Sequence, residues 1–175
     1  MVRYSYHMSP TRDTGKAPRR GQLHGEVARA VREVVLQLTL FNRHVAGNLD
    51  LKDVDHACLN LIERHGPLSP RDLAFRAGLH PATMTGVLDR LERGQWVVRE
   101  RDPSDRRAVL VRPLRLRTGE LTRLYAPMLT FMNRICSGYS VSELERIAEF
   151  LGLVADAGRD ASENLAADQQ VEESR

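Results

Sequence analysis

Residues 66–112 read GPLSPRDLAFRAGLHPATMTGVLDRLERGQWVVRERDPSDRRAVLVR, and this stretch decides the fold. It opens with a short helix: Ser69 is a good N-cap, a proline follows at the first helical position, and Gly78 suits the left-handed residue that ends a helix. Only two residues separate this helix from a second one, which we expect over Pro81–Arg93 with Gly94 behind it. Two short helices joined by so tight a turn indicate a helix-turn-helix.

After the second helix the hydrophobic period changes from about 3.6 residues to about 2. Trp96–Arg99 and Val109–Arg112 alternate as strands do, and the polar sequence DPSDRR (102–107) between them is a turn. Pro113 ends the second strand, because proline cannot continue a ladder of hydrogen bonds. A β-hairpin with a charged tip therefore follows the two helices directly, which predicts a winged helix-turn-helix.

A long helix is predicted before this unit. From Gly21 to Gly47 apolar residues recur at intervals of three and four, and Gly47 ends the helix. The members of this stripe are Val27, Val31, Val34, Leu38, Phe41 and Val45. Asp50 then starts another helix as its N-cap, with Asp53 at N3, and Gly66 stops it.

Two more helices are predicted behind the hairpin. The first runs from about Thr118 to Ser137, and Pro127 inside it should kink or break it. Its apolar stripe consists of Leu121, Leu124, Met128, Met132 and Ile135. The second starts at a capping box, in which Ser140 and Glu143 bond each other's backbone N–H groups, and an acidic tail follows it.

Basic residues concentrate on the predicted winged unit. Residues 64–117 hold twelve arginines and six acidic residues, a net charge of +6, whereas the whole chain of 175 residues carries +3. Of the 26 basic residues 24 are arginine, which binds phosphate bidentately and reads guanine edges better than lysine does. On charge alone a solvated face is nearly as good an explanation, but the coincidence with the winged unit favours double-stranded DNA as the partner.

Composition and motifs exclude several classes of protein. No segment approaches the roughly 20 apolar residues of a membrane span, and residues 1–20 lack the apolar stretch of a secretory signal. Cys58 and Cys136 cannot form a disulfide framework, so a reducing cytoplasm is expected, and both lie on apolar stripes where buried, unreactive thiols are typical. The sequence contains no Gly-rich phosphate loop, G-x-S-x-G or H-E-x-x-H motif, so we expect no enzyme, no cofactor and no metal site.

The segments LHPATMTGVLDRLE (79–92) and DPSDRR, in this order, resemble the MarR family of bacterial transcription regulators, and the resemblance covers about residues 36–151. It implies a mainly α fold with a small β-hairpin, and a homodimer. The implied segments are a flexible basic arm (1–20), an N-terminal dimerisation helix (21–49), a winged DNA-binding core (50–116), C-terminal dimerisation helices (117–166) and a frayed acidic tail (167–175). The chain departs from the family's pattern at His80, where small N-capping residues are commoner, and after the hairpin, where RPLRLRTGELT intervenes.

Residues expected to contact DNA fall into three groups. The N-terminal half of the second helix of such a pair reaches base edges in the major groove, and the candidates there are His80, Ala82, Thr83, Thr85 and Gly86. The candidates for phosphate contacts are Ser69, Arg71, Arg76, Arg90, Arg99 and Arg101. In the hairpin tip the resemblance implies that one acid–arginine pair stiffens the turn while another arginine enters a narrow minor groove. We favour Arg106 at the tip and Arg107 paired with Asp102 or Asp105.

The resemblance also implies a regulatory role. Family members often respond to a small, commonly aromatic or anionic ligand held between the dimer helices and the winged unit. The residues expected near such a crevice are Asn42, Arg43, His44, His56 and Asn60. We therefore expect a ligand-responsive repressor on a palindromic operator. The alternative is a winged-helix scaffold that binds proteins and no specific DNA.

Overall fold

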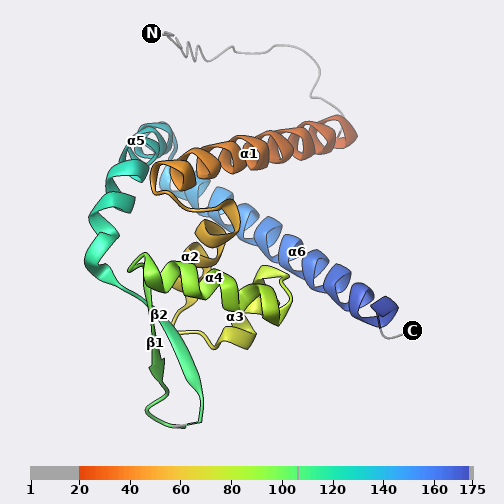
Figure 1. Cartoon of the computed structure of the whole chain (residues 1–175). Helices are drawn as coiled ribbons and strands as arrows, with labels where there is room; N and C mark the ends of the chain where they lie inside the picture. The colour runs from red at the N-terminus through yellow and green to blue at the C-terminus, as the bar shows by residue number, and fades with distance from the viewer. Residues whose placement is uncertain (1–19, 106, 174–175) are drawn as a thin grey trace, which may run out of the picture. The chain divides into compact units, whose positions relative to one another are not determined.

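The computed structural model describes residues 20–105 and 107–173. Its elements in chain order are α1 (Arg20–Asn48), α2 (Asp53–His65), α3 (Pro70–Ala77), α4 (Pro81–Arg93), β1 (Val97–Arg101), β2 (Val109–Pro113), a 3-10 helix η1 (Arg115–Arg117), α5 (Thr118–Cys136) and α6 (Val141–Glu173) (Figure 1). This mainly helical fold with a β-hairpin confirms the predicted fold class. Within these two ranges no helix is long and apolar enough to cross a membrane. The predicted basic arm lies outside the described residues except for Arg20.

The chain divides into two compact units, and the division falls inside α1. The described part of the first unit is the α1 segment 20–40, whose side chains are mostly exposed. The second unit begins at Phe41 and contains all the later elements. The end of α1 belongs to the second unit, because Phe41 and Val45 there pack into its core.

One core holds the winged unit together. α2, α3 and α4 pack on one another, β1 packs on α4, and β2 packs on α2 and α3. The largest fully buried apolar side chains are Trp96, Leu59, Ile62, Leu73, Met84, Leu88, Leu91, Val87, Val97 and Val111. Met84, Val87, Leu88 and Leu91, which recur on one side of α4, are all among them. One face of α4 is therefore fixed by packing, and its opposite face remains available.

The capping signals act as predicted. The Ser69 hydroxyl accepts a hydrogen bond from the backbone N–H of Asp72 at 3.1 Å and caps α3. Gly78 ends α3 with a φ of 62°, a conformation that side chains with a Cβ rarely adopt. At the start of α6 the backbone N–H of Ser140 donates to Glu143 Oε2 at 2.8 Å, and the N–H of Glu143 donates to Ser140 Oγ at 3.4 Å. Local sequence thus sets these helix ends.

The start of α2 differs from the prediction, which was wrong about Asp50. This residue has a φ of 55° and lies in the turn that ends α1, while Lys52 is the N-cap of α2 without a side-chain hydrogen bond. α1 continues through Gly47, and the N–H of Leu51 closes the turn on the carbonyl of Ala46 at 2.9 Å. Asp50 is therefore used to end one helix and is not free to begin the next.

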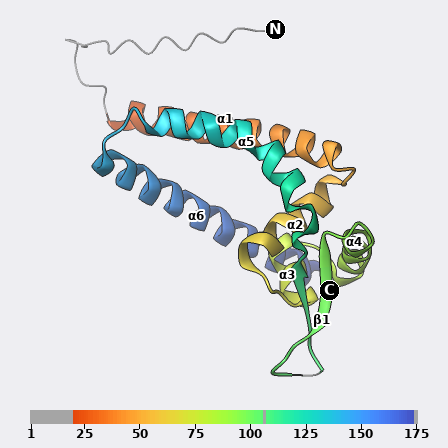
Figure 2. The ribbon, with the colours of Figure 1, turned by 90° about the vertical axis from the view of Figure 1, so that its left-hand side faces the viewer.

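The hairpin is antiparallel, with Val97 opposite Pro113 and Arg101 opposite Val109. The first strand starts one residue later than predicted. Trp96 is buried, and its backbone N–H donates to the carbonyl of Leu91 in α4 at 2.9 Å, so this N–H is not part of the ladder. In both views the two strands extend beyond α3 and α4 (Figures 1 and 2). The tip of the hairpin is therefore free of the helices that support its base.

The loop before α3 adds a bridge that the sequence pattern does not predict. Leu68 and Val111 exchange two backbone hydrogen bonds, at 3.1 and 2.8 Å. β1 lies along one edge of β2, and the bridge to Leu68 occupies the other edge at Val111, the buried residue of β2. It fixes the hairpin base against the loop that leads into the helix-turn-helix.

α5 runs unbroken through Pro127, so the predicted kink is not a break. Leu121 and Leu124 at its start pack against the core of the winged unit. Phe131 and Ile135, further along the same face, are 56% and 58% exposed. The apolar stripe is thus covered at one end and open at the other.

α6 extends to Glu173, past the predicted boundary at residue 166, and residues 174–175 of the predicted tail lie outside the described ranges. Large apolar side chains are exposed along it: Val141, Ile147, Phe150, Leu151, Leu153 and Leu165. Leu23, Val27, Val34, Val35, Leu36, Leu38 and Leu40 are likewise exposed on α1. Exposed apolar surface of this extent is typical of an association surface.

Candidate nucleic-acid interface

The candidate base-reading residues lie on the exposed face of α4. Ala82, Thr83 and Thr85 are exposed and Gly86 is half-buried, which follows from the burial of the opposite face. The Thr85 hydroxyl donates to the carbonyl of Pro81 at 3.2 Å, so its oxygen keeps lone pairs with which to accept a hydrogen bond. The structure brings these predicted residues together on one accessible surface.

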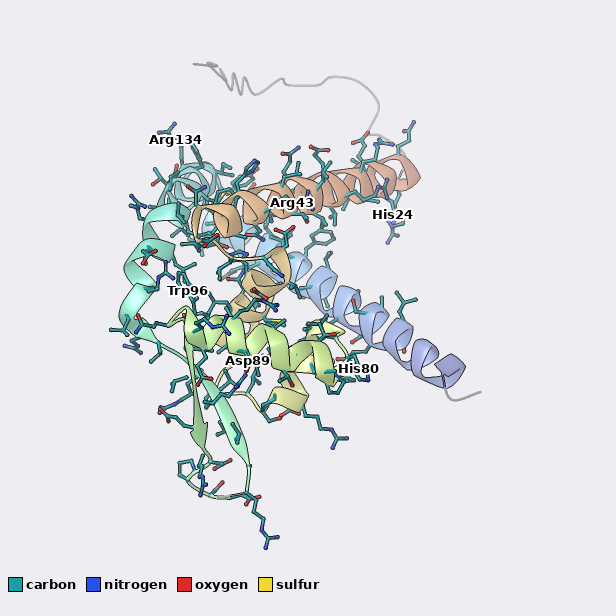
Figure 3. The ribbon with its side chains drawn as sticks, in the orientation of Figure 1. His24, Arg43, His80, Asp89, Trp96 and Arg134 are labelled. Atoms are coloured by element: carbon teal, nitrogen blue, oxygen red, sulfur yellow. The ribbon has the colours of Figure 1, made fainter. Side chains whose placement is uncertain are left out.

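His80 caps this helix, at the position where the resemblance implies a smaller N-capping residue. Its Nδ1 accepts a hydrogen bond from the backbone N–H of Ala82 at 3.2 Å. The ring is exposed at the N-terminal end of α4 (Figure 3). The imidazole therefore both satisfies the first turn and stands beside the candidate base-reading residues.

The predicted phosphate candidates separate into free and engaged side chains. Arg71, Arg76 and Arg101 are exposed on α3 and β1. The Ser69 hydroxyl is engaged in the cap and also donates to the Asp72 carboxylate at 2.7 Å. The other two arginines, Arg90 and Arg99, are held by carboxylates of the chain itself.

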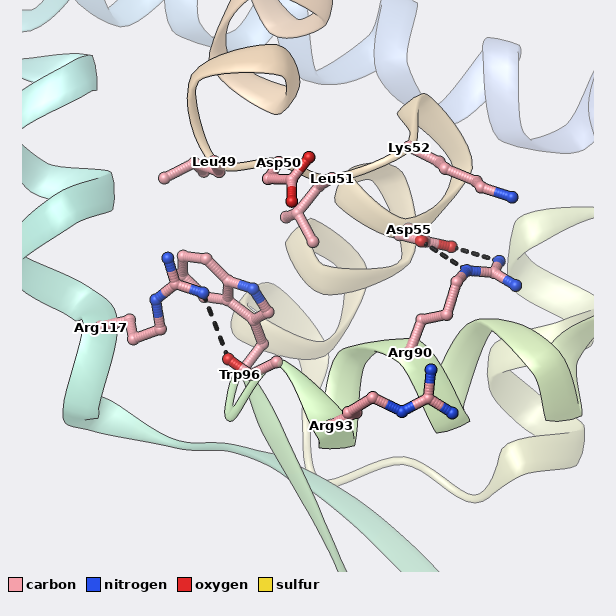
Figure 4. Close-up of a pocket in the computed structure, with 10 residues that line it drawn as sticks. Leu49, Asp50, Leu51, Lys52, Asp55, Arg90, Arg93, Trp96 and Arg117 are labelled. Atoms are coloured by element: carbon pink, nitrogen blue, oxygen red, sulfur yellow. Dashed lines mark hydrogen bonds and ion pairs between the residues drawn. The ribbon is translucent and has the colours of Figure 1, made fainter.

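Arg90 joins α4 to α2 through Asp55 (Figure 4). Its Nε and Nη2 donate to the two carboxylate oxygens at 2.8 and 2.6 Å, and the Asp55 side chain is only 2% exposed. The hydrogen bonds to Asp55 raise the pKa of Arg90 above its ordinary value. Arg90 thus ties α4 to α2, and its guanidinium is engaged by a buried carboxylate of the chain itself.

The hairpin tip is ordered by its two aspartates. Asp102 Oδ1 accepts hydrogen bonds from the N–H and hydroxyl of Ser104 at 2.7 and 2.6 Å, and these bonds lower the pKa of Asp102. Asp105 Oδ1 accepts from the backbone N–H of Arg107 at 2.9 Å, whereas no ion pair of the Arg107 guanidinium occurs among the described residues. Arg106, which was predicted to lie at the tip, is outside the described residues. Asp102 and Asp105 stiffen the turn by accepting hydrogen bonds from two backbone N–H groups and from the Ser104 hydroxyl.

The predicted ligand residues do not all come together. Tyr125 of α5 donates to Asn42 Oδ1 at 2.9 Å and lies 3.2 Å from His56 Nε2. Burial raises the pKa of Tyr125, and Asn60 opposes this shift. Since the single Tyr125 hydroxyl proton goes to Asn42, the His56 ring acts as the donor in their contact. Tyr125 was missed in the sequence because a single tyrosine on an amphipathic helix carries no motif.

The two remaining ligand candidates lie on the surface. Arg43 pairs with Asp53 at 3.0 Å, with both side chains more than half exposed, and His44 is exposed. His56, in contrast, is buried, and burial lowers its pKa against the opposing effect of Asp53. A neutral, hydrogen-bonded His56 therefore links α2 to α5, and Arg43 and His44 are not part of this cluster.

A pocket of about 550 Å³ lies beside the Arg90–Asp55 pair (Figure 4). None of the five predicted ligand residues lines it; its lining is Leu49, Asp50, Leu51, Lys52, Asp55, Arg90, Arg93, Gly94, Trp96 and Arg117. Arg117 stacks over Trp96 at 3.9 Å, donates to the carbonyl of Gly94 at 3.2 Å and pairs with Glu120 at 2.7 Å. This arginine ties the start of α5 to the end of α4, and its place beyond the hairpin gave no signal in the sequence.

The possible metal ligands of the described ranges, including the two cysteines, form no metal-binding group. No group of three His, Cys, Asp or Glu side chains there is arranged to hold a metal ion. Cys58 is fully buried, and burial together with Asp55 raises its pKa to about 11, so the thiol stays protonated near neutral pH. Cys136 is half-buried, less than predicted.

The chain matches the model of the MarR family over residues 51–109. It is 30% identical over 146 residues to YcgE, an HTH-type transcriptional regulator of Bacillus subtilis, covering 83% of this chain and 95% of YcgE. Its fold is similar to that of a mutant MepR from an S. aureus clinical isolate, with a TM-score of 0.65, 16% identity and coverage of 75% of this chain and 96% of that one. A second mutant of S. aureus MepR, solved bound to an oligodeoxyribonucleotide, matches with a TM-score of 0.51 at the same identity and coverage.

Proposed function

Because the chain belongs to the MarR family of winged-helix transcriptional regulators, we propose that it binds a specific double-stranded DNA operator and represses transcription in a bacterial cytoplasm. The observation that carries this proposal is the exposed face of α4, which holds small and hydroxyl side chains next to free arginines and a projecting hairpin. A helix of this size fits the major groove, and a hairpin beside it reaches the adjacent groove or backbone.

Within this proposal each group of residues has a distinct task. Thr83, Thr85 and Ala82 contact base edges or thymine methyl groups, and Gly86 permits close approach of the backbone. The exposed Arg71, Arg76 and Arg101 bind phosphates and supply affinity that depends on salt. An arginine of the hairpin tip, Arg106 in preference to Arg107, enters the minor groove.

The operator is proposed to be palindromic because the protein acts as a homodimer. Two-fold symmetric dimers bind two similar half-sites. Support comes from the exposed apolar side chains on α5 and α6 of the second unit, which a second copy of the chain would bury. Phe131 and Ile135 form the exposed apolar end of α5.

The DNA proposal is tested by selecting bound duplexes from a random library with the wild-type protein and with Thr85→Ala. We expect a palindromic consensus for the wild type, and a relaxed preference at one base pair of each half-site for Thr85→Ala, with a loss of about 1 kcal/mol measured by gel shift. Thr130→Ala is the matched control, since Thr130 is also exposed and donates to the carbonyl four residues before it. Binding without any sequence preference would instead favour the protein-interaction scaffold.

Repression is proposed to be relieved by a small anionic effector. The pocket beside Arg90 has a size suited to a small ligand, and Lys52 and Arg93 in its lining are exposed cations. A ligand there would touch α4 itself. We expect an aromatic carboxylate from a screened panel to raise the Tm of the wild type, less so that of Arg93→Ala, and to release operator DNA in the gel shift. A panel that changes neither Tm nor DNA binding contradicts the effector.

A further inference from the structure

Arg99 on β1 is held by two acidic residues of α4. Its Nη2 lies 2.6 Å from Asp89 Oδ1, and its Nη1 lies 3.3 Å from Glu92 Oε2. The backbone N–H of Arg99 also donates to Glu92 Oε1 at 3.3 Å, and Nη2 reaches the carbonyl of Thr85 at 3.5 Å. One side chain therefore contacts two successive turns of α4 from the hairpin.

These contacts engage the groups that a phosphate would need. Both terminal nitrogens of Arg99 face carboxylates, and its side chain is 29% exposed. Two carboxylates around one guanidinium leave the cluster with a net negative charge. Such a cluster offers no attraction to a DNA phosphate, in contrast to the exposed Arg101 two residues further along the same strand.

Asp89 is the partner of Arg99 that lies on the outward side of α4. It lies on the face of α4 that carries Thr85, one turn further along, and its side chain is 49% exposed (Figure 3). An unpaired carboxylate at this place would repel the DNA backbone. The ion pair with Arg99 neutralises this acid and at the same time fixes it toward the hairpin.

We propose that Arg99 is a positioning residue that locks the recognition helix to the hairpin, and that it is not a phosphate ligand. The inference rests on the proposed DNA-binding function and deepens it. The guanidinium sets the distance between the two parts that enter neighbouring grooves, so that both fit one duplex at once. Arginine is required because its planar fork reaches two carboxylates, which a lysine ammonium on a flexible stem does not reproduce.

The test measures operator affinity at a series of salt concentrations by fluorescence anisotropy for Arg99→Gln, Arg99→Lys and Arg101→Gln. The logarithm of the binding constant falls as the logarithm of the salt concentration rises, and each lost phosphate contact makes this slope shallower by about 0.9. We expect Arg99→Lys, which keeps the positive charge, to bind about tenfold more weakly with an unchanged slope, and Arg99→Gln, which also leaves Asp89 unpaired, to bind more weakly still. Arg101→Gln, the control on the same strand, should make the slope shallower. Circular dichroism checks that each variant is folded.

A second arm tests the pairing itself. Glu92→Gln removes one of the two acids, and the double variant Arg99→Gln/Glu92→Gln should lose no more affinity than the worse single variant, because both act through one contact. The proposal is overturned if Arg99→Lys retains full affinity, as a phosphate-binding cation would, if Arg99→Gln binds as the wild type does, or if the losses of Arg99→Gln and Glu92→Gln add. Failure of the wild type to bind any duplex would instead overturn the proposed function.

Discussion

Replacing Arg90 with alanine is expected to lower the free energy of unfolding by about 3 kcal/mol, because it leaves the carboxylate of Asp55 buried without its partner. Asp55 is 2% exposed, and both of its oxygens accept hydrogen bonds from the Arg90 guanidinium. The value lies at the lower end for a broken buried pair, since 35% of the Arg90 side chain remains in contact with solvent. Urea denaturation followed by circular dichroism measures it.

Two further variants separate the ion pair from general effects. Arg93→Ala removes an exposed arginine from the same helix and should change stability by less than about 0.5 kcal/mol. The double variant Asp55→Leu/Arg90→Met replaces the pair by apolar side chains and should recover most of the loss. If Arg90→Ala is as stable as Arg93→Ala, the ion pair contributes nothing to the free energy of unfolding, and burial of an unpaired Asp55 carries no penalty.

Substituting both Phe131 and Ile135 with glutamate is expected to convert the proposed homodimer into a monomer. Both side chains are more than half exposed on one face of α5, and charges there would be buried against a second copy. Sedimentation equilibrium should then give the 19.8 kDa of a single chain. Operator affinity should fall by about 10²- to 10⁴-fold, because the two half-sites are no longer bound by one linked molecule.

The control for this pair is Asn133→Glu, which introduces a single negative charge at an exposed position on another face of α5. It should leave both mass and operator affinity unchanged. A Phe131→Glu/Ile135→Glu variant that still sediments as a dimer would place the interface elsewhere. A wild-type monomer that binds a palindrome tightly would contradict dimerisation altogether.

Local signals predicted most of the fold, because each depends on residues close together in sequence. The Ser69 cap, the left-handed Gly78 and the capping box at Ser140 all act within one helical turn. Asp50 shows the limit of such signals: two helix ends compete for it, and the choice depends on how the chain closes the preceding turn.

The candidate site was predictable only in part, because its arginines are alike in sequence and differ in their partners. The face of α4 follows from helical periodicity, so Thr85 could be assigned to the outward side and Thr83 to its flank. Nothing near Arg90 or Arg99 in sequence distinguishes them from Arg101, since the pairing of Arg90 with Asp55 spans 35 residues. Long-range ion pairs of this kind emerge only once the helices are packed.

Arg117 has a mechanical consequence for the whole winged unit. One guanidinium holds the ring of Trp96, the carbonyl of Gly94 and the carboxylate of Glu120. Because Glu120 belongs to α5 itself, the contacts with Trp96 and Gly94 are the ones that join the start of α5 to the end of α4. A rotation of the first turn of α5 therefore has to move the end of α4 as well or break both of these contacts.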